Sequence, residues 1–249
     1  MGDLKRVLIL GGSGDAVGLA ARVADLPGLR VITSLAGRTR QPLVTSPHTR
    51  IGGFGGVAGL VDYLRSQSID LLIDATHPFA AQISHHAATA AATVGLPHLM
   101  LIRPAWEESS GDQWRSVDSH AAAAAQCAQW GGRIFLTIGR QELAAFAHLQ
   151  DHWFLMRMID PPHPDAAIPP GQVLLARGPF ALSEERSLLQ DHGIEAIVSK
   201  NSGGAATYSK IIAARELGLP VIMIQRPPMP RGDRATNIET ALSWLQQHR

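Results

Sequence analysis

The stretch LLIDATHPFAAQIS, residues Leu71–Ser84, contains a strand, a polar loop and a helix in direct succession. The apolar start predicts a buried strand, Asp74–Pro78 interrupts it, and an Ala-rich helix follows. In open α/β sheets, ligands bind outside the carboxyl ends of the strands. We therefore expect this loop, which contains an acid, a hydroxyl and an imidazole, to contact a ligand.

The same alternation of apolar runs and helix-like segments continues along the chain, as in parallel sheets with crossover helices. The predicted strands are Arg6–Leu10, Arg30–Leu35, Asp70–Ile73, His98–Ile102, Arg133–Ile138, Trp153–Ile159, Val173–Ala176, Ala196–Ser199 and Val221–Ile224. The predicted helices are Ala16–Ala24, Val57–Ser66, Ala80–Val94, Ser119–Gln129, Gln141–Ala147, Leu182–Asp191, Thr207–Leu217 and Thr236–Gln247. The pattern predicts an α/β fold.

A repeat indicates two related halves. Ile69–Pro104 and Ile194–Pro227 both contain a strand, a polar loop and an Ala-rich helix, and they end in GLPHLMLIRP and GLPVIMIQRP. Pro104–Gln113 is polar and rich in turn residues, so it is the candidate linker. We expect a Rossmann-like dinucleotide-binding domain at residues 1–104 and a second Rossmann-like domain at residues 105–249. A cleft between two such domains is a common ligand site.

Composition excludes several classes of protein. The net charge of +1 over 249 residues, without a dense Lys/Arg run, argues against a nucleic-acid partner. Neither a transmembrane segment nor a signal peptide is indicated. One cysteine, Cys127, suits a reducing compartment and no disulfide framework. We expect a soluble cytoplasmic protein without a metal site, either a monomer or a small homo-oligomer. Ten histidines other than His77 lack ligand spacing and are interpreted as surface or packing residues.

Two glycine-rich loops are candidate cofactor sites. Gly11-Gly12-Ser13-Gly14 follows the first strand, where glycines would let a pyrophosphate approach the positive end of the next helix. The strict G-x-G-x-x-G pattern fails at Val17, so a plain tight turn is the alternative. The segment Arg50–Leu60, RIGGFGGVAGL, would suit a cofactor phosphate or nicotinamide face, or a flexible surface loop.

The end of the second strand, Ala36–Arg40, bears on the choice of cofactor. NAD-binding proteins usually have an acid there, whereas this chain has Gly37, Arg38 and a second arginine. A guanidinium can pair with a 2′-phosphate, which favours NADPH over NADH. A solvated basic loop is the alternative.

The second half has candidate anion-binding residues. Ser199–Gly204, SKNSGG, could hold an anion through Lys200 and backbone N–H groups, but it is not a P-loop because the lysine precedes the glycines. Arg140, Arg157 and Arg177 lie near predicted strand ends and suggest a polyanionic ligand. Surface salt bridges are the alternative interpretation.

These motifs together resemble the precorrin-6A reductases of corrin biosynthesis over nearly the whole chain. The resemblance lies in GGSGDA (11–16), AGRT (36–39), RIGGFGG (50–56), DATHPFA (74–80), RPAW (103–106), GDQW (111–114), LTIGRQEL (136–143), ARGPF (176–180) and SKNSGG (199–204). It implies two Rossmann-like domains with a cleft, and reduction of one macrocycle C=C bond by a reduced nicotinamide. Ser13-Gly14-Asp15 departs from the family's usual Thr, variable residue and Glu, but it keeps the hydroxyl and the charge.

The motifs and the resemblance define the expected site. We expect NADPH to contact Gly11, Gly12, Ser13, Gly14, Gly37, Arg38, Gly53, Phe54, Gly55, Asp74, Ala75 and Thr76. We expect the macrocyclic polycarboxylate to contact Arg140, Arg157, Arg177, Lys200, Asn201, Ser202 and Gly203. His77 has two possible roles: it donates the proton, or it only shapes the cofactor site and water donates the proton. A cobalt-precorrin-6A reductase that uses NADH, and a dinucleotide sensor without turnover, are the alternative functions.

Overall fold

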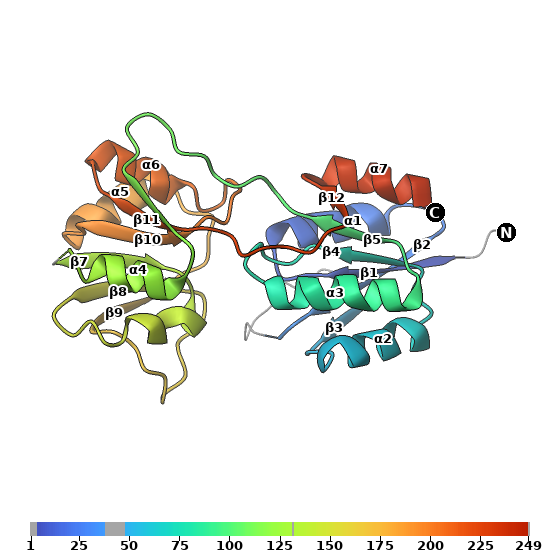
Figure 1. Cartoon of the computed structure of the whole chain (residues 1–249). Coiled ribbons are helices and arrows are strands. Elements are labelled where there is room, and N and C mark those ends of the chain that lie inside the picture. The colour runs from blue at the N-terminus through green and yellow to red at the C-terminus, as the bar shows by residue number, and fades with distance from the viewer. Residues whose placement is uncertain (1–3, 38–47, 131, 249) are drawn as a thin grey trace. The chain divides into compact units, whose positions relative to one another are not determined.

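The computed structural model describes residues 4–37, 48–130 and 132–248. The chain forms two α/β units: Met1–Pro104 with Pro227–Arg249 form the first, and Ala105–Arg226 form the second (Figure 1). Each unit contains one six-stranded sheet, and every described strand pairing is parallel. The predicted α/β class with two parallel sheets is confirmed, whereas the cleft between the domains stays a prediction.

The sheet of the first unit has the strand order β12-β5-β4-β1-β2-β3. Its strands are β1 (Lys5–Leu10), β2 (Leu29–Leu35), β3 (Thr49–Ile51), β4 (Leu71–Asp74), β5 (His98–Leu101) and β12 (Asp233–Ala235). Its helices are α1 (Gly14–Ala24), α2 (Gly56–Ser66), α3 (Ala81–Val94) and α7 (Ile238–His248).

Helices cover both faces of this sheet because its central strands are apolar on both sides. Val7 and Ile9 of β1 lie in a core with α1 and α7, whereas Leu8 and Leu10 lie in a core with α2 and α3. Successive side chains of a strand point to opposite faces, so four consecutive apolar residues serve two cores. This two-sided burial fixes the strand ends that carry the loops.

The sheet of the second unit has the strand order β6-β11-β10-β7-β8-β9. Its strands are β6 (Trp114–Val117), β7 (Arg133–Thr137), β8 (Trp153–Met158), β9 (Gly171–Leu175), β10 (Ala196–Lys200) and β11 (Val221–Ile224). Its helices are α4 (His120–Cys127), the 3₁₀ helix η1 (Arg140–Phe146), α5 (Leu182–Asp191) and α6 (Ser209–Leu217).

The two copies of the repeat fold in the same way, as β4-α3-β5 and as β10-α6-β11. Both helices end at the glycine of the Gly-Leu-Pro sequence, because Gly95 (φ 72°) and Gly218 (φ 66°) adopt the left-handed conformation. Each copy occupies the corresponding position in its own sheet. The structure therefore agrees with the interpretation of two related halves.

The edge strands are exchanged along the chain. After β5 the chain enters the second unit and forms β6 beside β11, and after β11 it returns and forms β12 beside β5. The expected second domain of residues 105–249 thus differs from the structure in its last part. Residues 227–249 belong to the first unit because Asp233–Ala235 pairs with Leu99–Leu101, and α7 packs into that core.

The sequence pattern missed three strands, β3, β6 and β12, which are short and lie at or near sheet edges. Edge strands need not be continuously apolar, because one side and often one face meet solvent. The helix predicted at Gln141–Ala147 is a 3₁₀ helix that spans Arg140–Phe146.

Candidate functional site

The candidate cofactor site lies where the strand order of the first sheet reverses. The chain proceeds from β1 to β2 on one side and from β4 to β5 on the other, so the loops after β1 and β4 are neighbours. Ser13 joins them, because its Oγ donates a hydrogen bond to the carbonyl of Ala75 at 2.7 Å. The same Oγ accepts one from the backbone N–H of Ala16 at 3.1 Å and caps α1.

The first glycine loop leaves room for a ligand. Gly12 has a φ of +115°, and a Cβ atom added to Gly12 or Gly14 would meet no protein atom within 4 Å. Gly11 is different, because its Cβ would lie 3.2 Å from Leu35 and so it packs against the unit. Open space beside glycine backbone and a helix N-terminus fits a dinucleotide pyrophosphate.

The DATHPFA loop is shaped by its own polar groups. Asp74 is 3% exposed, and its Oδ1 accepts hydrogen bonds from Thr76 N at 3.0 Å and Thr76 Oγ1 at 2.6 Å. His77 Nδ1 accepts from the N–H of Phe79 at 3.2 Å. In a neutral imidazole the proton therefore lies on Nε2. The half-buried His77 then presents an N–H at Nε2, and it can deliver a proton only after Nδ1 is protonated as well.

Arg50 orders the second glycine loop, and sequence reasoning missed this role. Its guanidinium donates to the carbonyls of Gly52 and Gly53, the latter at 2.6 Å, and lies 3.9 Å from the ring centroid of Phe54. Gly55 has a φ of +78° and directly precedes α2, so the loop turns sharply there. The available signal was a cation at the start of a glycine run, whose carbonyls need a donor.

The loop after β2 is described only in part. Gly37 follows β2 with a φ of +72°. Arg38, the residue expected to select NADPH, lies outside the described residues, as does the rest of 38–47.

The arginines of the repeated Arg-Pro sequence both hold loops at the carboxyl ends of strands. Arg103 Nη1 pairs with Asp15 Oδ2 at 2.6 Å, at the start of α1. Arg226 Nε donates to Asn201 O at 2.9 Å and its Nη2 to Ser202 O at 3.0 Å. The doubled sequence signalled a shared role, but only the structure identifies the partners.

In the second unit the corresponding reversal lies between β7 and β10. Lys200 ends β10 and reaches the loop after β7. A Cβ atom added to Gly139 of that loop would lie 4.0 Å from Lys200 Nζ. Arg140 begins η1, and its Nη1 donates to Pro161 O at 3.1 Å. His120 lies 3.7 Å from Glu142; burial lowers the pKa of His120, Glu142 opposes this and Lys200 adds to it.

The SKNSGG loop uses Asn201 as an internal brace. Asn201 is 3% exposed; its Oδ1 accepts from Trp106 N at 2.8 Å and its Nδ2 donates to Trp106 O at 3.0 Å. Ser202 N donates to Lys200 O at 2.7 Å, and Gly203 adopts a φ of +67°. Both polar atoms of the Asn201 amide bind protein, so its side chain positions this loop, and its expected contact with the substrate stays a prediction.

The three predicted substrate arginines do not share one environment. Arg140 and the exposed Arg177 follow β7 and β9. Arg157 lies within β8, is 8% exposed and pairs with Glu185 at 2.6 Å. The expectation that Arg157 contacts the substrate does not match this burial, because its charge already has a partner inside the unit.

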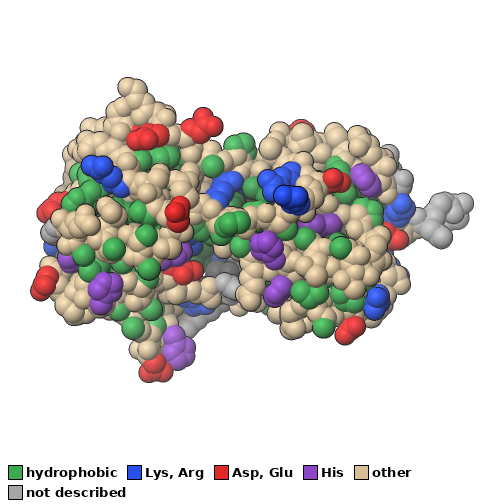
Figure 2. Space-filling view, viewed as in Figure 1, with side chains coloured by type: hydrophobic (Ala, Val, Ile, Leu, Met, Phe, Trp, Pro, Cys, Tyr) green, Lys and Arg blue, Asp and Glu red, His purple; other side chains and the backbone are tan. Residues whose placement is uncertain are grey.

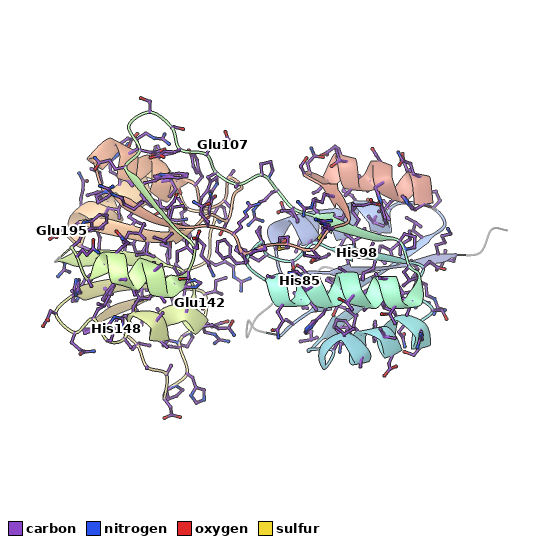
Figure 3. All side chains as sticks on the ribbon, viewed as in Figure 1. His85, His98, Glu107, Glu142, His148 and Glu195 are labelled. Carbon is purple, nitrogen blue, oxygen red and sulfur yellow. The ribbon has the colours of Figure 1, made fainter. Side chains whose placement is uncertain are left out.

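Other titratable groups lie on helices and strands of the two units (Figure 3). His85 lies on α3, where its Nε2 is 3.2 Å from Pro228 O, and His98 begins β5, where burial lowers its pKa. Burial raises the pKa of the Cys127 thiol to about 12. Across residues 4–37, 48–130 and 132–248, no group of three or more His, Cys, Asp or Glu could hold a metal.

Charged side chains of both signs lie on the surface. On the face shown in Figure 2, basic side chains occur singly or in small groups, with acidic side chains elsewhere on that face. No helix in the described part of the chain is long and apolar enough to cross a membrane.

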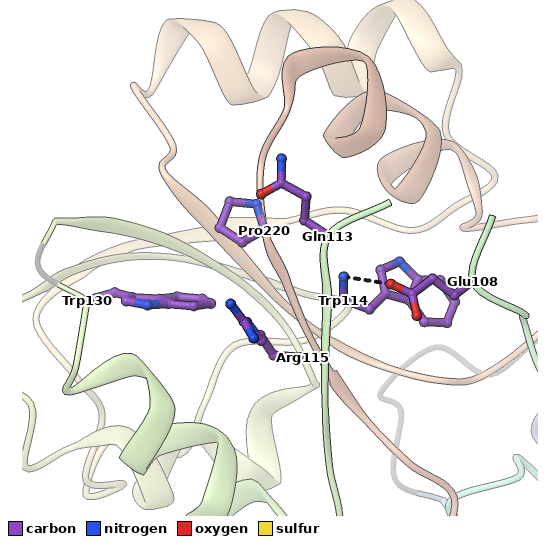
Figure 4. A pocket seen from close by; sticks show the side chains of 6 residues that line it. All are labelled: Glu108, Gln113, Trp114, Arg115, Trp130 and Pro220. Atoms are coloured by element: carbon purple, nitrogen blue, oxygen red, sulfur yellow. Dashed lines mark hydrogen bonds between the residues drawn. The ribbon is translucent and has the colours of Figure 1, made fainter. Parts of the chain in front are cut away.

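A cavity of about 440 Å³ in the second unit lies at the amino ends of strands, and the candidate loops follow the carboxyl ends (Figure 4). Trp114 begins β6 and Pro220 precedes β11, so these lining residues mark the amino ends of strands. Arg115 and Trp130 also line it. The SKNSGG loop follows the carboxyl end of β10, so this cavity is not part of the candidate site.

Two parallel-sheet units with glycine, lysine and arginine loops after their strands define an α/β protein of the Rossmann-like, two-unit class. The family model described as Precorrin-6x reductase CbiJ/CobK matches residues 6–246, so the chain belongs to that family. The family consists of oxidoreductases of cobalamin biosynthesis, and its reductase name implies a reduced nucleotide as electron donor.

Individual relatives agree over nearly the full length. A precorrin-6A reductase of Rhodococcus erythropolis is 49% identical over 97% of this chain and 98% of its own length. A solved structure of a CobK precorrin-6A reductase is 44% identical and covers 98% of this chain and 97% of its own, with a TM-score of 0.93. A cobalt-precorrin-6A reductase of Priestia megaterium is 29% identical over 96% of this chain and 97% of its own length.

Proposed function

We propose that this chain is an NADPH-dependent precorrin-6A reductase, which reduces one macrocycle C=C bond of precorrin-6A to give precorrin-6B. The main support is the open glycine loop of Gly12 and Gly14, which lies where the strand order of the first sheet reverses. The chain is also 49% identical to a precorrin-6A reductase. The cobalt substrate is less well supported, because the relative of that name is only 29% identical. A sensor without turnover would not need the cationic loops of the second unit.

In this proposal the first unit binds and orients the cofactor. Backbone N–H groups at Gly12–Gly14 and the start of α1 would hold the pyrophosphate, while Ser13 fixes this loop against Ala75. The reduced nicotinamide, when bound, supplies a hydride. His77 is the candidate side chain for the proton that must accompany the hydride: it would act as the imidazolium, which requires Nδ1 to take up a proton in place of the bond from Phe79 N–H, and water is the alternative donor.

The second unit would bind the substrate through its carboxylates. Lys200, Arg140 and Arg177 lie at or just beyond carboxyl ends of strands, where cations can form charge-assisted hydrogen bonds. Ser202 and Gly203 would add backbone groups from the loop that Asn201 and Arg226 hold in place. Cytoplasmic location and a monomer or small homo-oligomer stay predictions.

Replacing Lys200 by alanine should lower kcat/KM for precorrin-6A at least tenfold, equivalent to about 1.4 kcal/mol, while the thermal midpoint changes little. The reason is the loss of a cation at the end of β10 that would contact a substrate carboxylate. Steady-state reduction and thermal melting measure the two effects. Lys5→Ala, a half-buried lysine in β1 of the first unit, is the matched control and should keep full activity. A folded Lys200→Ala enzyme with wild-type kcat/KM would remove Lys200 from the site.

A further inference from the structure

Three charged side chains are buried together beneath the loops proposed to bind the substrate. Arg157 of β8, Glu185 of α5 and Lys210 of α6 are 8%, 1% and 3% exposed. Arg157 Nη1 donates to Glu185 Oε1 at 2.6 Å. Glu185 Oε2 is buried and has no hydrogen-bond partner among the described residues. Burying charge with incomplete pairing costs stability, so the cluster is poorly explained as a device for stability alone.

One side of the cluster contacts the ARGPF segment, Ala176–Phe180. The Cζ of Arg157 lies 3.7 Å from the ring centroid of Phe180. The backbone N–H of Phe180 donates to Ala206 O at 3.3 Å, in the turn that leads into α6. Arg157 therefore supports the end of one candidate substrate loop, and this loop is joined to the turn that follows the other.

The other side of the cluster supports the SKNSGG segment, Ser199–Gly204. Lys210 Nζ donates to Thr207 O at 2.9 Å and lies 4.8 Å from the ring centroid of Trp106. Trp106 Nε1 in turn donates to Gly204 O at 2.9 Å. The ammonium group thus lies behind the indole that holds the glycine end of this loop.

We propose that Arg157, Glu185 and Lys210 form a positioning cluster that holds Ala176–Phe180 and Ser199–Gly204 in the conformation that binds substrate carboxylates. The inference rests on the proposed function and assigns a role to residues that do not touch the substrate themselves. Removing the Lys210 charge should weaken substrate binding and leave the cofactor loops of the first unit unchanged.

The cluster should also make substrate binding depend on pH. Burial and the neighbouring Arg157 lower the pKa of Lys210 to about 7, while Glu185 opposes this shift. Two other sets of charged groups face the cluster: Glu184 lines the same cavity as Arg157 and Glu185, and Tyr208, which packs on Trp106, accepts a hydrogen bond from Arg215. Arg215 is itself paired with Asp112. Lys210 is charged below this pKa and neutral above it, so the cation–π contact and the positive potential weaken as the pH rises. The substrate KM should therefore increase between about pH 6 and pH 8.

The test compares Lys210→Met with Lys5→Met in the full chain, with precorrin-6A and NADPH. Lys5 is the matched control because its Nζ also donates to a backbone carbonyl, His248 O at 2.8 Å, in the first unit. Lys210→Met should raise the substrate KM at least about fivefold, with kcat at saturation and the NADPH Kd within about twofold of wild type. Its KM should no longer vary with pH, whereas wild type and Lys5→Met should retain the variation.

A folded Lys210→Met enzyme with the wild-type KM and pH profile would overturn the positioning role. If this variant does not fold, Phe180→Leu tests the positioning role instead. This substitution removes the ring that packs on Arg157, at a half-buried position. It should raise the substrate KM about threefold, and an unchanged KM would overturn the role. Wild-type protein that reduces no precorrin-6A would instead remove the proposed function and the inference with it.

Discussion

Gly12→Val should weaken NADPH binding at least about 100-fold, equivalent to about 2.8 kcal/mol, while the protein stays folded. Gly12 adopts a φ of +115°, and its added side chain would enter space that contains no protein atom within 4 Å. The substitution therefore strains the loop by about 1–3 kcal/mol and fills the space proposed for the pyrophosphate. Equilibrium titration with NADPH and thermal melting measure the two consequences separately.

Gly28→Val is the matched control for this variant. Gly28 also has a positive φ, +79°, and open space at its Cβ, but it precedes the amino end of β2, whereas Gly12 follows the carboxyl end of β1. The Gly28→Val variant should lose about as much stability as Gly12→Val and should keep the NADPH affinity of the wild type. If both variants retain wild-type affinity, the first glycine loop does not bind the cofactor.

Arg38→Ala should weaken NADPH by roughly 1.5–3 kcal/mol, or about tenfold to 150-fold, and should change NADH affinity much less. The prediction comes from the sequence, where Arg38 follows the second strand in place of the acid typical of NAD-binding proteins. The 2′-phosphate is the group that distinguishes the two cofactors, so a bidentate partner affects only one of them. Paired titrations with NADPH and NADH measure the ratio.

Arg30→Ala serves as the control, because this exposed arginine lies at the other end of β2. It should leave the binding of both cofactors unchanged. An equal loss of NADPH and NADH affinity in Arg38→Ala would show that Arg38 does not select the 2′-phosphate.

The sequence predicted most of the sheet because central strands carry strong signals. Leu8, Ile9, Leu72 and Ile73 form short apolar runs that only burial on both faces explains. The Gly-Leu-Pro repeat identified the equivalent halves. The exchange of β6 and β12 was not visible, because three exposed or partly polar residues such as Asp233–Ala235 do not specify which sheet they join.

The candidate loops were predictable as loops, but the roles of their side chains were not. Ser13 was expected to bind cofactor, and the structure shows that its hydroxyl also links two loops through Ala75, far away in the sequence. Asn201 and Arg157 have the polarity of ligands, yet their partners Trp106 and Glu185 lie within the same unit. Pairing between distant segments decides whether a polar group is available to a ligand, and a local motif does not contain that information.

The missed residues follow the same rule. The guanidinium of Arg50 binds the carbonyls of the glycine run, but no local motif predicts this role. In the sequence, Lys210 is not distinguished from any other lysine of a helix. Its ammonium group lies against Trp106, which is distant in the sequence. Such residues are found only when the three-dimensional contacts are known.

The central claim is that this chain transfers a hydride from NADPH to precorrin-6A. The direct measurement is the mass of the product formed by the purified protein with precorrin-6A and NADPH deuterated at the transferable position of the nicotinamide. The account predicts a product that carries one deuterium and one proton from solvent, with oxidised cofactor formed in equal amount. Unchanged precorrin-6A, together with turnover of cobalt-precorrin-6A or of neither substrate, would contradict it.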